Sequence, residues 1–387
     1  MRTRRRCGGR MMIVYRFLQW ARSASAADRA KAAHLLARAY LESRLAPLER
    51  EAAETAMIYL LDDPSPNVRL SLAETLADDR GAPRALVLSL ARDQRTIASV
   101  IVERSPVLLD RDLVDLVGEA GEAMRMTIAR RQNLSIGVVA ALVEIGSVDL
   151  VCRLLDRDDI AIANVSLARI AERFGVDAAI RMRLLDRDAL PGAIRHDLIL
   201  RVGDALATHA LLRATMGHER VRRVTDEACT QATLALAGEV PTTEMPALVE
   251  HLRISGRLTS AFLLHALCAK RPDFFVTAVA RLSGYREQRV QSLLDGGRTQ
   301  ALNALFRSAG LFDEVLDVMV EATTMRRLCR SDLAAFPAKL ATQYADRRRK
   351  SPVVDDLLLR LERMDRNARR ERARLFASEA ENAVHAA

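Results

Sequence analysis

The stretch that decides the fold is DDPSPNVRLSLAETLA, residues 62–77. Its acidic pair can cap a helix, because a carboxylate accepts hydrogen bonds from free backbone N–H groups. Its two prolines end the preceding helix and favour an extended connection. Val68, Leu72 and Leu76 then recur every fourth position, which places them on one apolar helix face. The stretch therefore predicts a short connection that leads into an amphipathic helix.

Related phrases recur along the first half of the chain, each with a polar link followed by an apolar helical run. Aligning them places Val68, Ile97, Met124, Ile162 and Ile194 at matching positions, 29, 27, 38 and 32 residues apart. Further apolar segments lie between the phrases, so each unit would hold two helices. Helix pairs repeated at roughly thirty residues are typical of α-solenoids, in which each unit buries its apolar face against its neighbours.

The phrase at residues 62–69 resembles the HEAT repeat, in which an aspartate and an arginine commonly bridge adjacent units. The resemblance implies this bridging role for Asp62 and Arg69. Arg125 and Arg195 match the arginine alone, and two other units have alanine there. The resemblance therefore does not imply a continuous ladder of ion pairs.

A second resemblance covers more of the chain. Residues 102–108, 166–175, 195–206 and 256–311 are similar to an alphaproteobacterial family known only as a domain of unknown function. The likeness runs from about Pro64 to Leu311. It implies a bacterial helical protein and no particular activity.

Composition supports an all-α fold. Half of the residues are apolar but only 4% are aromatic, and the β-branched runs lack hairpin turns. Five scattered cysteines show no metal or redox spacing, which fits a reducing cytoplasm. No apolar run approaches the ~20 residues that span a bilayer. We expect a cytoplasmic protein without a transmembrane segment.

Four parts are expected, and the basic charge lies in the outer two. Residues 1–22 are a disordered or capping segment with seven arginines and no acid. The HEAT-like α-solenoid would span 23–206, an irregular helical block 207–328 and a basic helical tail 329–387. Residues 326–374 carry 15 basic and 7 acidic groups, so the body between the ends is slightly acidic.

Candidate sites are few, and we predict no catalytic residue, metal ligand or cofactor. His196 beside Asp197 is the only local acid–base constellation. Because neighbours on a helix point in different directions, a polar edge of a repeat is the better interpretation. The double glycine after Asp295 is interpreted as a helix stop. The candidate polyanion contacts are the basic cluster Arg347, Arg348, Arg349 and Lys350.

These observations favour a non-enzymatic interaction scaffold or regulator that binds an unknown protein partner on its repeat surface. The alternative is a nucleic-acid-associated protein that binds through its basic tails. A repeat-type glycosylase or lyase is a third possibility. Phe174 is the only aromatic residue in 62–206, so surfaces for stacking unpaired bases are sparse there.

Overall fold

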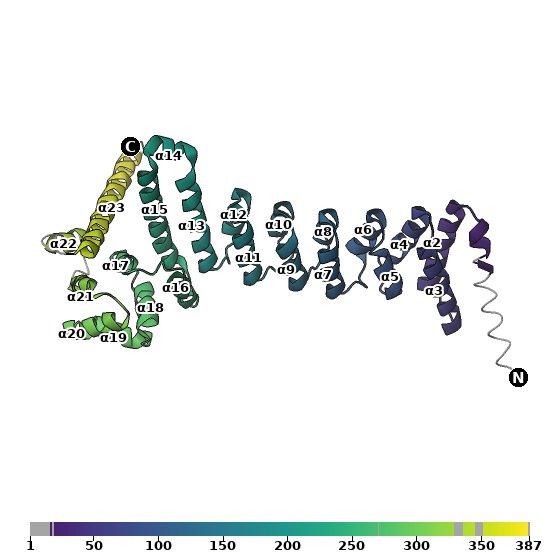
Figure 1. The fold of residues 1–387 in the computed structure, drawn as a ribbon, viewed down its shortest axis with the longest axis horizontal. Coiled ribbons are helices and arrows are strands. Elements are labelled where there is room, and N and C mark those ends of the chain that lie inside the picture. Colours follow the sequence, from purple (N-terminus) through teal and green to yellow (C-terminus); the bar gives the residue numbers. More distant parts are fainter. Residues whose placement is uncertain (1–15, 18, 270, 329–335, 345–350, 386–387) are drawn as a thin grey trace. The chain divides into compact units, whose positions relative to one another are not determined.

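The computed structural model describes residues 16–17, 19–269, 271–328, 336–344 and 351–385. Every regular element in these ranges is a helix, and the described residues form no strand. The all-α prediction is confirmed (Figure 1). None of the described helices combines the length and apolarity needed to cross a membrane.

The chain divides into two compact units, Met1–Asp188 and Ala189–Ala387, called unit 1 and unit 2 below. The sequence analysis ended the repeat array at residue 206. In the structure, α13 (Gly192–Thr208) packs on α15 and α16 of unit 2. Gly203 permits this packing, because a Cβ atom there would lie 2.4 Å from the Cys229 Sγ on α15.

Unit 1 consists of helix pairs. Its helices are α2 (Ala26–Glu42), α3 (Pro47–Leu61), α4 (Pro66–Leu76), α5 (Arg84–Leu90), α6 (Arg95–Arg104), α7 (Asp110–Glu119), α8 (Glu122–Ile128), α9 (Ile136–Ile145), α10 (Val148–Leu155), α11 (Asn164–Phe174) and α12 (Ala178–Leu185). Helices two places apart pack together, as in α2–α4–α6–α8 and α7–α9–α11. Figure 1 shows the even-numbered and odd-numbered helices of unit 1 as two rows, named here the even row and the odd row.

The even row has a regular repeat that the sequence alignment missed in part. In each even-row helix from α4 to α12, the third residue is a large buried apolar residue. These residues are Val68, Ile97, Met124, Leu150 and Ile180. Their spacings are 29, 27, 26 and 30 residues. Ile162 was the wrong partner, because it precedes Ala163, the N-cap of α11, and the stretch before it is a turn. The 38-residue gap therefore disappears.

Unit 2 is built around two helices, α17 and α18, whose central stretches are buried. Its helices after α13 are α14 (Ala210–Met216), α15 (His218–Glu239), α16 (Met245–Ile254), α17 (Ser260–Cys268), α18 (Pro272–Ser283), α19 (Glu287–Gly296), α20 (Thr299–Ser308), α21 (Asp313–Leu328), α22 (Phe336–Gln343) and α23 (Pro352–His385). Every residue in 262–268 and in 274–280 is buried. Phe275 of α18 meets the ring of Phe306 on α20 edge-on, at 6.3 Å between centroids. This core organises the remaining helices of unit 2.

The C-terminal segment belongs to this core. Leu340, Tyr344, Leu357, Leu358 and Leu361 are buried in the same apolar cluster as α17 and α18. The sequence analysis treated 329–387 as a separate basic tail, because it contains the basic cluster at residues 347–350. Its apolar residues instead complete unit 2. The candidate polyanion residues Arg347, Arg348, Arg349 and Lys350 lie outside the described residues.

Candidate functional site

Paired arginines and carboxylates join successive even-row helices. Arg29 on α2 donates from Nε and Nη2 to both carboxylate oxygens of Asp63, at 2.6 and 2.9 Å. Arg69 on α4 makes the same fork-like contact with Asp93, at 2.6 and 3.1 Å. Bidentate pairs of this kind combine charge with a fixed geometry. Asp62 is exposed, so the acid in the bridging position is Asp63, one residue later.

The other arginines suggested by the resemblance make different contacts. Arg125 donates from Nε to the Val117 carbonyl at 2.9 Å and lies 3.4 Å from Glu122. Glu122 in turn accepts from the Ser147 backbone N–H at 3.2 Å, so the link to the next helix pair passes through it. Arg195 donates locally to the Leu190 carbonyl at 3.2 Å.

A second arginine series binds helix ends. Arg131 donates to the carbonyls of Val102 and Ser105 at the end of α6. Arg157 and Arg187 do the same at the ends of α8 and α10. The last carbonyls of a helix have no partner within the helix, so these side chains satisfy acceptors that would otherwise need water. Some of the arginines of unit 1 therefore stabilise the fold by donating hydrogen bonds to helix ends.

The odd row exposes apolar side chains at helix starts. Leu48 of α3, Leu109 before α7, Ile136 of α9 and Val165 of α11 are 50%, 47%, 53% and 79% exposed. Leu109, Ile136 and Val165 are 27 and 29 residues apart, which matches the repeat. The even-row helices α4, α6, α8 and α10, described in full, expose no large apolar side chain. The central helices of the two rows thus differ in surface chemistry, whereas α2 and α12 at the ends of the even row expose Leu35, Met182 and Leu185.

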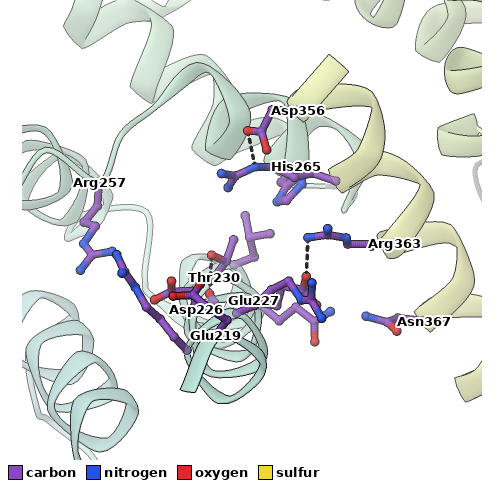
Figure 2. A pocket seen from close by; sticks show the side chains of 14 residues that line it. Glu219, Asp226, Glu227, Thr230, Arg257, His265, Asp356, Arg363 and Asn367 are labelled. Atoms are coloured by element: carbon purple, nitrogen blue, oxygen red, sulfur yellow. Dashed lines mark hydrogen bonds and ion pairs between the residues drawn. The ribbon is translucent and has the colours of Figure 1, made fainter. Parts of the chain in front are cut away.

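Unit 2 holds a charged cleft between α15, α17 and α23, of about 550 Å³. Two ion pairs cross or line it: Arg363 with Glu227 at 2.9 Å, and Arg360 with Asp356 at 2.8 Å (Figure 2). Burial, with Arg360 as the second cause, lowers the pKa of His265 to about 4. Its Nε2 has no hydrogen-bond partner within the described part of the chain. The further lining charges are Glu219, Arg222, Arg223, Asp226 and Arg257.

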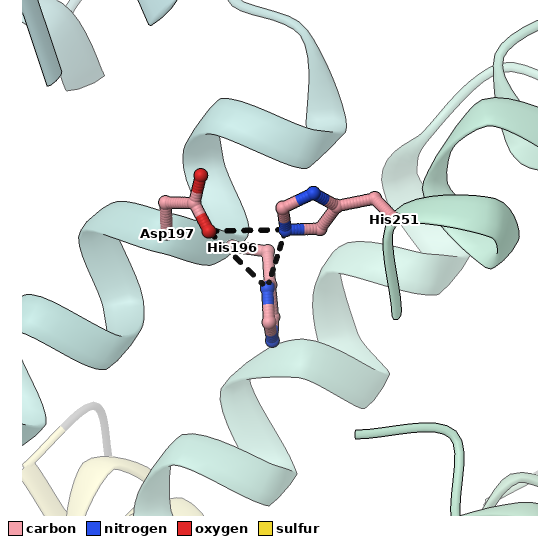
Figure 3. Close-up of side chains that lie close together, drawn as sticks. All are labelled: His196, Asp197 and His251. Atoms are coloured by element: carbon pink, nitrogen blue, oxygen red, sulfur yellow. Dashed lines mark hydrogen bonds and ion pairs between the residues drawn. The ribbon is translucent and has the colours of Figure 1, made fainter. Parts of the chain in front are cut away.

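A compact cluster of possible metal ligands joins α13 and α16. Nε2 of His251 lies 3.0 Å from Oδ1 of Asp197 and 3.1 Å from Nδ1 of His196. Nδ1 of His196 lies 3.9 Å from the same carboxylate oxygen, and Figure 3 shows these three atoms joined in a triangle. Burial, followed by the neighbouring His251, lowers the pKa of His196 to about 4, so this imidazole is neutral at pH 7.

The expectation of a polar edge at this position was wrong for His196. Its side chain is 1% exposed, and Asp197 converges with it although the two are neighbours on one helix. Another prediction held. Gly297, with φ of 61°, is the left-handed residue that ends α19, as the double glycine indicated.

A family model described as "Uncharacterised protein conserved in bacteria (DUF2336)" matches residues 97–350. The chain belongs to this family. The match confirms the expected membership in a bacterial family of unknown function. No curated protein and no solved structure matches the chain.

The DUF2336 match includes the histidine cluster, most of the charged cleft and the odd-row stripe from Leu109 onward. Sequence reasoning missed the cluster because two complete helices, α14 and α15, lie between Asp197 and His251 in the chain, and no local spacing connects them. It also missed the arginines that bind carbonyls. A detectable signal existed there: Arg131, Arg157 and Arg187 recur at 26 and 30 residues, each just after an even-row helix.

Proposed function

We propose that this DUF2336 protein is a non-enzymatic, HEAT-like interaction scaffold whose odd row binds an amphipathic helix of a protein partner. The observation that carries the proposal is the exposed apolar residue at the start of successive stacked helices. Single exposed apolar residues are ordinary on protein surfaces. They recur near the starts of α7, α9 and α11, whereas α4, α6, α8 and α10, all described in full, expose no large apolar side chain, and this regularity is not explained by chance exposure.

The spacing of this stripe specifies the partner. Packed helices lie about 8–10 Å apart, so Leu109, Ile136 and Val165 would present anchors at about that interval. An α-helix rises 1.5 Å per residue, and seven residues cover roughly 10 Å. A partner helix that crosses the row with apolar residues at i, i+7 and i+14 would therefore meet all three.

The chemistry of the helix starts adds a preference. Helix N-termini carry free N–H groups and a partial positive charge, which favour acidic neighbours. At α9 and α11 the first turn holds no acidic side chain, so acidic residues that flank the apolar anchors of the partner would contact these two ends, whereas α7 begins with its own Asp110 and Asp112. We therefore expect a partner segment that is amphipathic and acidic, as in other cases where a helix docks in a groove.

The test is affinity capture of the full chain from its native cells, with nuclease present, read by mass spectrometry. The variant replaces Leu109, Ile136 and Val165 by aspartate. All three side chains are exposed, so the fold should survive. The matched control is Met182→Asp on α12, a 66% exposed apolar residue of the even row. We expect a dominant protein that the control retains and the triple variant loses.

A photo-crosslinking residue at position 136 should join the same protein, and one at 182 should not. Equal recovery by both variants would refute the proposed surface. Recovery of nucleic-acid-binding proteins that disappear with nuclease would favour the nucleic-acid alternative.

A further inference from the structure

We propose that His196, Asp197 and His251 of unit 2 bind a divalent transition-metal ion, for which Zn²⁺ is the best match. This inference is independent of the proposed protein-binding surface of unit 1. It rests on the distances between the three ligand atoms, on their chemistry and on their position on packed helices.

The distances fit a metal coordination sphere. Zn²⁺ binds imidazole nitrogen and carboxylate oxygen at about 2.0–2.2 Å, and a tetrahedral ion separates such ligand atoms by about 3.3–3.4 Å. The three separations here are 3.0, 3.1 and 3.9 Å. An ion at the centre needs only sub-ångström adjustments of side chains. Two imidazoles and one carboxylate are also a ligand set typical of Zn²⁺ and other first-row ions.

Protonation gives an independent reason. A carboxylate oxygen and two ring nitrogens meet at this point, and all three can present lone pairs to it. If Nε2 of His251 carries a proton, this N–H can donate a linear hydrogen bond to Asp197 or to His196, but not to both. A cation satisfies all three acceptors at once. Burial of His196 makes an unsatisfied nitrogen costly there.

The scaffold around the cluster suits a site that joins two helices. His196 and Asp197 lie on α13 and His251 on α16, and these helices pack directly on each other. His251 and Asp197 keep 25% and 47% of their side-chain surface exposed, so an ion and a water ligand have access. The neighbouring Glu250 is engaged by Arg253 and Arg281 and is not available as a ligand.

The positive charge of Arg257 opposes metal binding, so removing it tests the direction in which the metal affinity changes. Arg257 and His196 line the same cavity of about 440 Å³. A guanidinium there repels a divalent cation. Arg257→Gln should therefore tighten metal binding, whereas an effect through general loss of structure would weaken it.

The experiment uses the full chain without a histidine tag, stripped with a chelator and titrated with Zn²⁺ by calorimetry. We expect one ion per chain. His251→Gln and Asp197→Asn should each weaken binding by about 100-fold or more, beyond the 10–100-fold typical of residues that only support a ligand. Both residues are partly exposed, so these variants should fold. His196 is avoided because its burial makes unfolding the simpler outcome.

His218→Gln is the matched control, since His218 is an exposed histidine of the same unit. It should bind Zn²⁺ like the natural chain. Thermal unfolding in chelator verifies that each variant is folded, and added Zn²⁺ should raise the midpoint of the natural chain only where the cluster is intact. Absence of binding by the natural chain, or equal binding by the cluster variants and the control, would overturn the proposal and leave a hydrogen-bonded cluster.

Discussion

Asp63 shows how much one carboxylate can organise in this chain. Both of its oxygens accept from Arg29, and Oδ1 also accepts from the Ser65 backbone N–H at 2.9 Å. One side chain thus joins two helix pairs and shapes the turn that leads into α4. The hydrogen bond from Arg29 is the main cause that lowers the pKa of Asp63.

Asp63→Asn should lower the thermal midpoint of unit 1 by roughly 5 °C at neutral pH, because the buried fork loses its charge. Since the folded pKa of Asp63 lies below its unfolded value, its contribution is present above about pH 4 and is lost as the pH falls further. The difference between variant and natural chain should therefore shrink in acid. Differential scanning calorimetry across this pH range measures both effects.

Asp62→Asn is the control, because Asp62 is exposed and has no such pair. It should shift the midpoint by less than about 2 °C. A larger effect at Asp62 than at Asp63 would contradict the assignment of the bridging acid. The resemblance to the HEAT repeat implied a bridging role for Asp62, whereas Asp63 makes the contact in the structure. The choice between two adjacent aspartates depends on the path of the chain through the prolines, which the sequence alone does not give.

At the level of elements, the arginines that bind carbonyls connect the C-terminal ends of consecutive even-row helices. Arg131 follows α8 and binds the end of α6, and its own carbonyl accepts from Arg157 after α10. The bonds are backbone-directed, so they tolerate changes in the side chains around them. They therefore secure the stacking of helices as short as seven or eight residues, which are marginal alone.

Arg131→Ala should destabilise unit 1 by about 1–3 kcal/mol, since it leaves carbonyls of α6 without a donor. The local result should be faster amide hydrogen exchange in residues 97–105, read by mass spectrometry. Arg130→Ala is the matched control, because Arg130 is the exposed neighbour. Unchanged exchange in α6 of the Arg131 variant would show that water replaces the arginine at little cost.

The sequence predicted where helices form, but it did not predict which helices pack against each other. The four-residue periodicity of Val68, Leu72 and Leu76 predicted α4 and its buried face, and all three side chains are fully buried. Ile162 misled the alignment because an apolar residue in a turn carries the same signal as one in a helix. Contacts between helices distant in sequence, such as α13 with α16, leave no periodic trace.

On the scale of the whole molecule, the distribution of charge and apolar surface changes how the C-terminal segment should be tested. Helix α23 contains seven arginines and seven acidic residues, so it is neutral by itself. Its first half buries Val354, Leu357, Leu358 and Leu361 in the core of unit 2, whereas residues 372–378 are exposed. The segment therefore contributes to the core of unit 2, and removing it removes buried apolar contacts as well as charge.

A chain that ends before Ser351 should leave unit 2 unfolded, because burying each of these four apolar side chains contributes about 1.5–3 kcal/mol. Their sum is comparable to the whole stability of a typical domain. A chain that ends after Arg372 keeps these contacts and the Arg363–Glu227 pair, and it should unfold like the full chain. Limited proteolysis and thermal unfolding followed by circular dichroism distinguish the two. If both truncations behaved alike, the C-terminal helix would be an appendage after all, and loss of nucleic acid or protein binding on truncation could then be assigned to its charge. If they differ as expected, charge-neutralising substitutions at residues 347–350, and separately among the arginines of residues 1–22, test the nucleic-acid alternative better than truncation does.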